Sequence, residues 1–173
     1  METSTVLVAG ATGLLGTEIS RQLRAKNIPV RAMVRNTTDP VKIEKLTKLG
    51  VRIVQGDLQD KESLSRVLQE VKTVISTISS IPSSYLPGEN DVQKVDLEGI
   101  KNLIDCGKNG RVQHFIYTSF SGQMDFDFPL RNAKRSVEQY LQESGIGYTI
   151  LRPSFFMELW LSAAVGFDAL NGK

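Results

Sequence analysis

Gly10-Ala11-Thr12-Gly13-Leu14-Leu15-Gly16 follows directly on the apolar run 6–8 and opens an amphipathic segment. A glycine at the end of a strand lets the chain turn without a Cβ clash. A second lets backbone N–H groups approach a phosphate, and a third lets the helix pack closely on the strand. The start of that helix favours an anion. The stretch therefore predicts a cradle for a nucleotide pyrophosphate, and the alternative is a glycine-rich turn without a ligand. The predicted contacts are Gly10, Thr12, Gly13, Leu14, Leu15 and Gly16.

Apolar, strand-like runs alternate along the chain with segments whose apolar residues recur every three or four positions. We predict strands at 5–9, 30–34, 51–54, 73–78, 113–118 and 148–151. We predict helices from near 14 onward and at 41–49, 61–70, 91–109 and 130–144, with a crossover loop at 81–90. Such alternation with right-handed crossovers gives an α/β fold, a doubly wound, Rossmann-like parallel sheet with helices on both faces.

Length and composition fit one domain. The 173 residues are 40% hydrophobic, and their formal net charge is +2, too small to favour nucleic acid or an anionic membrane. No apolar run reaches the roughly 18 residues of a membrane span, and no export leader is recognisable. The single cysteine, Cys106, cannot form an internal disulfide and is expected in a helix, buried or half-buried. A cytoplasmic location is therefore expected.

The end of the second predicted strand bears on the choice of nucleotide. A carboxylate about 20 residues after the glycines would bind the ribose hydroxyls of NAD, whereas an arginine can pair with the 2′-phosphate of NADP. Arg35 stands at this place and Asn36 follows it. The first acidic residue after the strand is Asp39. We expect NADP(H) rather than NAD(H), with Arg35 and Asn36 at the phosphate. The alternative is that Arg35 is a charged loop residue.

Several motifs together resemble one family. They are the Gly-x-x-Gly-x-x-Gly spacing of 10–16, Val34-Arg35-Asn36, Gly56-Asp57-Leu58 and Tyr148-Thr149-Ile150-Leu151-Arg152-Pro153. Over nearly its whole length the chain is similar to atypical short-chain dehydrogenases/reductases of the NmrA-like and NAD(P)H-azoreductase-like kind. The resemblance is specific for fold and cofactor and much less so for the reaction.

The resemblance implies further cofactor contacts. Asp57 would accept a hydrogen bond from the adenine amino group while Leu58 covers the ring, unless Asp57 is only a turn residue before a helix. Small side chains at the end of the fourth predicted strand, Thr77, Ile78 and Ser79, would line the ribose and diphosphate. Pro153 and Phe155 follow the last strand, where relatives flank the nicotinamide.

Catalytic residues are harder to assign. The superfamily's common Tyr-x-x-x-Lys pair uses the lysine to lower the tyrosine pKa and the tyrosine to pass a proton. Lys134 is present, but Leu130 occupies the tyrosine position. Lys134 lies within the apolar stripe of its helix, so we expect it to reach into a cleft and to take a cofactor or catalytic role, rather than to be a surface lysine. Ser119 matches the superfamily's polarising serine by location, or is a plain strand-end hydroxyl.

Other chemistry finds little support. His114, the sole histidine, opens an apolar strand, so a structural role is expected and no metal site is predicted. Asp125 and Asp127 are expected to be solvated acids of a loop over the cleft.

Two functions remain open. One is an NADPH-dependent reductase of a small quinone, azo or carbonyl acceptor. The other is a non-catalytic dinucleotide sensor or assembly factor acting on a protein partner, which the missing tyrosine favours. We assign 1–153 to the dinucleotide-binding domain and the apolar 154–173 to an abbreviated substrate or lid region.

Overall fold

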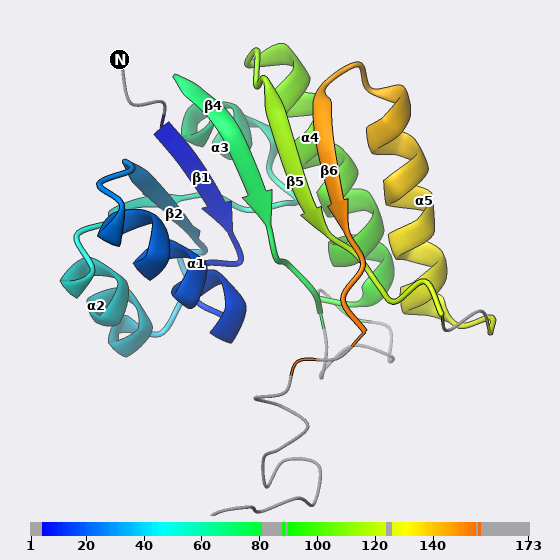
Figure 1. The fold of residues 1–173 in the computed structure, drawn as a ribbon, viewed down its shortest axis with the longest axis horizontal. Coiled ribbons are helices and arrows are strands. Elements are labelled where there is room, and N and C mark those ends of the chain that lie inside the picture. The colour runs from blue at the N-terminus through cyan, green and yellow to red at the C-terminus, as the bar shows by residue number, and fades with distance from the viewer. Residues whose placement is uncertain (1–4, 81–87, 89, 124–125, 155, 157–173) are drawn as a thin grey trace, which may run out of the picture.

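The computed structural model describes residues 5–80, 88, 90–123, 126–154 and 156. They form a six-stranded parallel sheet with the strand order β3-β2-β1-β4-β5-β6 (Figure 1). The strands are β1 (Thr5–Ala9), β2 (Val30–Val34), β3 (Arg52–Gln55), β4 (Val71–Ser76), β5 (His114–Thr118) and β6 (Gly147–Leu151). The predicted α/β doubly wound parallel sheet is confirmed.

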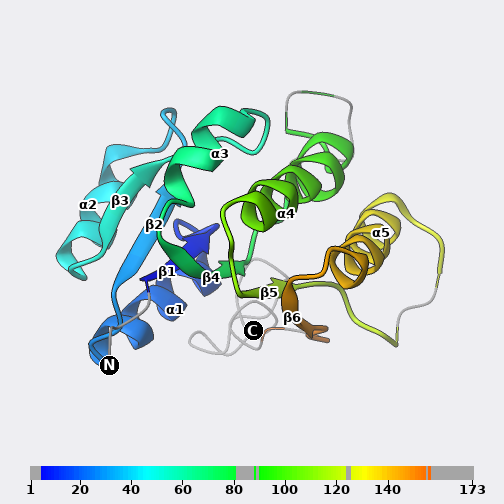
Figure 2. The same cartoon turned by 90° about the horizontal axis from the view of Figure 1, so that it is seen from above.

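Helices cover both faces of this sheet (Figure 2). The chain runs outward from β1 to β3 and then from β4 to β6 in the opposite direction, and right-handed crossovers place helices of opposite travel on opposite faces. α1 (Leu14–Ala25) and α2 (Pro40–Lys48) belong to the first run. α3 (Lys61–Val67), the π-helix η1 (Gln93–Gly99), α4 (Ile100–Asn109) and α5 (Pro129–Glu143) belong to the second.

Two hydrophobic cores lie on either side of the sheet, because successive side chains of a strand point to opposite faces. Leu7 of β1 packs into the core under α3, α4 and α5, together with Phe115 and Val137. Val8, its neighbour, packs with Leu46 of α2 in the other core. Both cores are therefore anchored on β1, which pairs with β2 on one side and β4 on the other.

Aspartates begin two of the helices. The Asp39 carboxylate accepts the N–H of Val41 at 2.8 Å, and Pro40 occupies the first turn of α2. Asp60 accepts the N–H groups of Glu62 and Ser63 at 3.0 and 3.1 Å in the same way. These caps, each five residues after the end of β2 or β3, fix the points at which α2 and α3 begin.

Three predicted elements differ from the structure by more than one residue. β4 spans Val71–Ser76 rather than 73–78; Thr77 makes one last backbone bond to Ala9, and the chain then leaves the sheet. α3 ends at Val67 rather than at residue 70. The helix predicted over 91–109 is divided into η1 and α4. At their junction, a Cβ on Gly99 would lie 2.7 Å from Cβ of Leu58, so the glycine allows a close approach to the chain after β3.

We predict that Gly16→Ala destabilises the fold by about 1–3 kcal/mol, since overpacking forces the backbone to shift. A Cβ at Gly16 would lie 2.2 Å from the carbonyl oxygen of Gly10, and neither atom belongs to a flexible side chain. Urea unfolding measures the loss. Gly13→Ala is the matched control, because its Cβ would meet Gly10 at an ordinary 3.4 Å. Equal stability of the two variants would contradict the close-contact argument.

Candidate functional site

A cavity of about 450 Å³ opens where β1, β2, β3 and β4 end. Its size lies within the range of small-molecule pockets, roughly 300–1,000 Å³. The chain leaves β1 toward β2 on one side and reaches β4 on the other, and ligands of doubly wound sheets bind at such a switch point. The lining residues are Gly10, Thr12, Gly13, Met33, Val34, Arg35, Thr38, Lys42, Gly56, Asp57, Leu58, Gln59, Thr77, Ile78, Ser79, Ser80, Asn90 and Val95.

The glycine loop forms the wall of the cavity next to α1. Gly10 has a φ of +87°, and a Cβ there would lie 2.6 Å from Oγ1 of Thr77, so β1 and β4 end in close contact. The N–H of Gly13 donates to the carbonyl of Gly10 at 3.1 Å. No side chain caps the N-terminus of α1 at Gly13. Its N–H groups can therefore bind an anion, as a pyrophosphate cradle requires.

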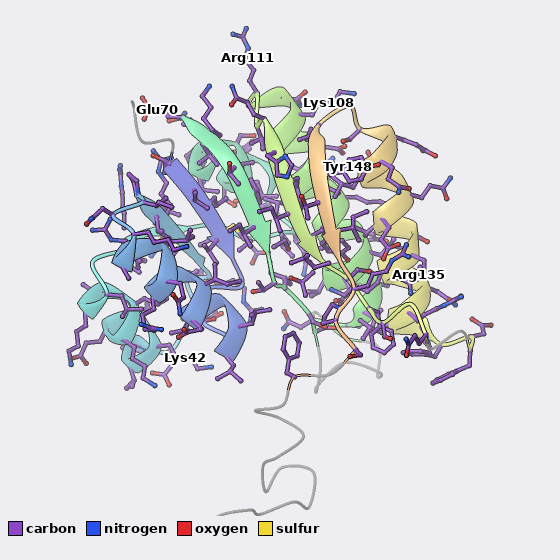
Figure 3. All side chains as sticks on the ribbon, viewed as in Figure 1. Lys42, Glu70, Lys108, Arg111, Arg135 and Tyr148 are labelled. Atoms are coloured by element: carbon purple, nitrogen blue, oxygen red, sulfur yellow. The ribbon has the colours of Figure 1, made fainter. Side chains whose placement is uncertain are left out.

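Two basic side chains line the cavity beyond the end of β2, namely Arg35 and Lys42. Nη1 of Arg35 donates to Oδ1 of Asn90 at 2.5 Å, which connects the end of β2 to the segment before η1. Lys42 lies on the side of the molecule toward which the strands run, opposite Glu70 and Arg111 (Figure 3). The sequence-based site missed Lys42, although it falls in the first turn of a predicted helix only seven positions after Arg35.

The exits of β3 and β4 supply the remaining walls. Asp57 lines the cavity, and one of its carboxylate oxygens accepts the N–H of Gln59 at 2.9 Å. Leu58 is buried, and its carbonyl accepts Nδ2 of Asn102 at 2.9 Å. The cavity thus brings together nine residues of the predicted cofactor site: Gly10, Thr12, Gly13, Arg35, Asp57, Leu58, Thr77, Ile78 and Ser79.

The other predicted cofactor residues lie elsewhere. Leu14 is 71% exposed, and Asn36 is also exposed; neither lines the cavity. Gly16 lies behind the loop, against Gly10. Phe155 is outside the described residues.

Leu15 and Pro153 line a second, apolar cavity of about 310 Å³ beside α1. It lies against the sheet face that α1 and α2 share, and Ile75, Ile116 and Leu151 contribute to its wall. Among the lining residues that the structure describes, Thr118 is the only one with a hydroxyl-bearing side chain. Leu15 and Pro153 therefore line one cavity together, and neither lines the first cavity.

Lys134 is buried inside the protein rather than aimed into the open cavity. Its side chain is 3% exposed, and Nζ lies 3.1 Å from a carboxylate oxygen of Asp96. Nζ also donates to the carbonyl of Ile78 at 2.8 Å and lies over the ring of Tyr117. Burial lowers the pKa of Lys134, and the Asp96 charge acts against that shift. Sequence reasoning missed Asp96, although it lies among apolar residues of the predicted helix.

Ser119, which follows β5, contacts a second cluster of charged side chains, centred on Glu138 of α5. Its hydroxyl donates to Glu138, which also accepts from Arg135 and Arg152. Burial alone would raise the pKa of Glu138, but the bonds from Arg152 and Ser119 hold it below its usual range. The cluster connects α5 to the ends of β5 and β6, and Lys134 and Ser119 therefore have different partners.

The remaining candidate residues have local partners. Nε2 of His114 lies 2.9 Å from Oγ1 of Thr149, on the neighbouring strand. Asp127 accepts Nδ2 of Asn132, and Asp125 lies outside the described residues. Cys106 is a buried residue of α4. Within the described part of the chain, no three His, Cys, Asp or Glu side chains are grouped as a metal site would require. No helix of that part is long and apolar enough to cross a membrane.

Comparison with solved structures gives relatives that bind nucleotides. The NADPH-dependent quinone oxidoreductase QOR2 of Escherichia coli, in complex with NADPH, matches with a TM-score of 0.73 and 28% identity. The match covers 92% of this chain and 52% of that one.

Curated relatives include proteins of different kinds. Photosystem II assembly factor Ycf39 of Cyanophora paradoxa is 35% identical over 88% of this chain and 46% of its own length. NAD(P)H azoreductase of Xenophilus azovorans is 30% identical over 88% of this chain and 49% of its own. The chain therefore spans about half the length of these relatives. The model of the NmrA-like family matches residues 2–170, and the chain belongs to this NAD(P)-binding, reductase-like family.

Proposed function

We propose that the protein binds NADP(H) in the cavity at the ends of β1 to β4 and is a reductase of a small quinone, azo or carbonyl acceptor. One observation carries this proposal: the uncapped N-terminus of α1 and the cations Arg35 and Lys42 line the same cavity. A dinucleotide with a 2′-phosphate presents anionic groups to both. NAD(H) lacks the group that the two cations would bind.

The residues present fit such a cofactor. Gly10, Gly13 and the first turn of α1 would hold the pyrophosphate, because no side chain caps the N-terminus of that helix. Asp57 would accept from the adenine amino group. Arg35 would bind the 2′-phosphate bidentately, after giving up its bond to Asn90 or sharing it. When bound, the cofactor supplies a hydride for the acceptor.

The acceptor end of the site is proposed beyond the ends of β5 and β6, with the second cavity on the α1 side of the sheet and Ser119 on the α5 side. Leu15 and Pro153 would border the nicotinamide there, with Phe155 and the rest of 154–173 forming a cover. Ser119 and Lys134 are the proposed catalytic groups. Each already has protein partners, Glu138 for the serine and Asp96 for the lysine, so direct contact with an acceptor requires an exchange of partners. A cytoplasmic location remains part of the proposal.

A non-catalytic role is the second candidate. Leu130, at the position of the superfamily's common tyrosine, is 2% exposed and cannot donate a proton. Ycf39 proteins, among the relatives of this chain, are named as assembly factors. In this alternative, bound dinucleotide changes a surface that a protein partner recognises.

We predict that Arg35→Glu weakens NADPH binding by about ten- to a hundredfold, the equivalent of losing a charge-assisted contact of roughly 1.5–3 kcal/mol. Calorimetric titration measures the dissociation constant. NADH affinity should change by less than about threefold, because NADH has no 2′-phosphate. Arg52 is the exposed first residue of β3 and therefore lies at the end of that strand away from the cavity. Arg52→Glu repeats the charge change there and should leave both affinities unchanged. Equal loss in both variants would point to overall charge instead.

A second prediction separates a reductase from a binding protein. Absorbance at the nicotinamide band should fall when NADPH and the protein meet a panel of quinone, azo and carbonyl acceptors. Lys134→Ala should abolish that turnover even at saturating NADPH if the lysine is catalytic. Tight NADPH binding with no turnover on any acceptor would favour the assembly-factor alternative.

A further inference from the structure

We propose that the buried pair of Asp96 and Lys134 is a positioning device that shapes the 78–80 segment, and that the effect of the pair on dinucleotide affinity is exerted through that segment. The inference rests on the proposed function, since it concerns the wall of the same cavity. It assigns Asp96 a role that the motifs of the sequence do not indicate.

The pair holds the segment at both of its ends. Nζ of Lys134 donates to the carbonyl of Ile78 at 2.8 Å. Asp96 accepts the backbone N–H of Ser80 at 3.0 Å with one carboxylate oxygen, which also accepts the Ser80 hydroxyl. The other carboxylate oxygen lies 3.1 Å from Nζ of Lys134. Three residues of backbone are therefore bound, at their first and last members, to one ion pair.

The same three residues form part of the cavity wall. Ile78, Ser79 and Ser80 all line the cavity, next to Thr77. Thr77 itself is fixed from the other side, because its N–H donates to the carbonyl of Ala9 at 2.9 Å. The segment thus lies between the glycine loop and the ion pair. Its conformation determines how closely a ribose or diphosphate can approach the end of β4.

Burial makes the pair a strong restraint. Asp96 is 0% exposed and Lys134 3%, so water cannot replace either partner. Removing one partner of such a pair leaves an uncompensated buried charge, and the groups around it rearrange. The groups able to rearrange here are Ile78 and Ser80, which have their bonds to the pair. A change at Asp96 therefore reaches the cavity although Asp96 is not among the residues that line it.

A direct role for the lysine predicts a different pattern of effects. If Lys134 bound the cofactor itself, removal of Asp96 would leave that contact available, and only lysine variants would lose affinity. If the pair works as one unit, Asp96→Asn and Lys134→Met lose similar affinity, and combining them adds little. Non-additivity of this kind is what a double-mutant cycle detects between groups in contact.

The experiment is a calorimetric titration of the full chain with NADPH for the wild type, Asp96→Asn, Lys134→Met and the double variant. Each single variant should raise the dissociation constant about tenfold or more. The dissociation constant of the double variant should not exceed that of the single variant that binds NADPH less tightly. Amide hydrogen exchange at Ser80 should become faster in Asp96→Asn and in the double variant, because the carboxylate that accepts its N–H is replaced by a neutral amide. If the charge variants do not fold, Ser80→Ala takes their place in the titration. It removes only the hydroxyl that donates to Asp96, and it should also raise the dissociation constant of NADPH.

Arg31→Met is the matched control, because Arg31 is a buried cation of β2 that donates to the carbonyls of Val67 and Gln69 and lines neither cavity. It should lower the unfolding temperature but leave NADPH affinity within about twofold. Loss of affinity in Lys134→Met alone, or equal loss in Arg31→Met, would overturn the inference. No NADPH binding by the wild type would instead refute the proposed function on which it rests.

Discussion

The backbone contact between Gly16 and Gly10 is the constraint on which the rest of the molecule depends. A Cβ at Gly16 would lie 2.2 Å from the Gly10 carbonyl oxygen, so α1 can start this close to β1 only because residue 16 is glycine. Gly10 in turn lies against Thr77 at the end of β4. One chain of close contacts therefore runs from the helix N-terminus through the ends of two neighbouring strands, and the cavity opens along it.

Sequence patterns were sufficient for the fold because the alternation of strands and helices leaves few arrangements once crossovers are right-handed. They were weaker wherever tertiary contacts decide the outcome. β4 stops at Ser76 because Thr77 and Ile78 are drawn into the cavity wall. A π-helix replaces the start of the predicted fourth helix, and nothing in its local sequence marks it. Asp96 could have been suspected, since an acid on an apolar helix face needs a buried partner.

Two buried charge clusters on α5 illustrate how one helix joins different parts of the sheet. Lys134 faces Asp96 and the end of β4, whereas Glu138, one turn later, faces Arg152 and the ends of β5 and β6. Each charge is paired, because an unpaired one would be costly at this depth. Burial of such pairs contributes little net stability compared with apolar residues. Their value here is geometric, since each fixes a loop that leaves the carboxyl edge of the sheet.

The absence of a tyrosine at position 130 narrows the chemistry within the proposed function. Tyr117 lies beside Lys134, but burial and the charge of Asp96 raise the pKa of its phenol, and its side chain is fully buried. It cannot replace the missing proton donor. A simple carbonyl would become a strongly basic alkoxide and needs a proton delivered as the hydride arrives, whereas a quinone forms a phenolate-type anion that can take its proton from water. If the protein is a reductase, the residues on its α5 side therefore favour quinones over simple carbonyls.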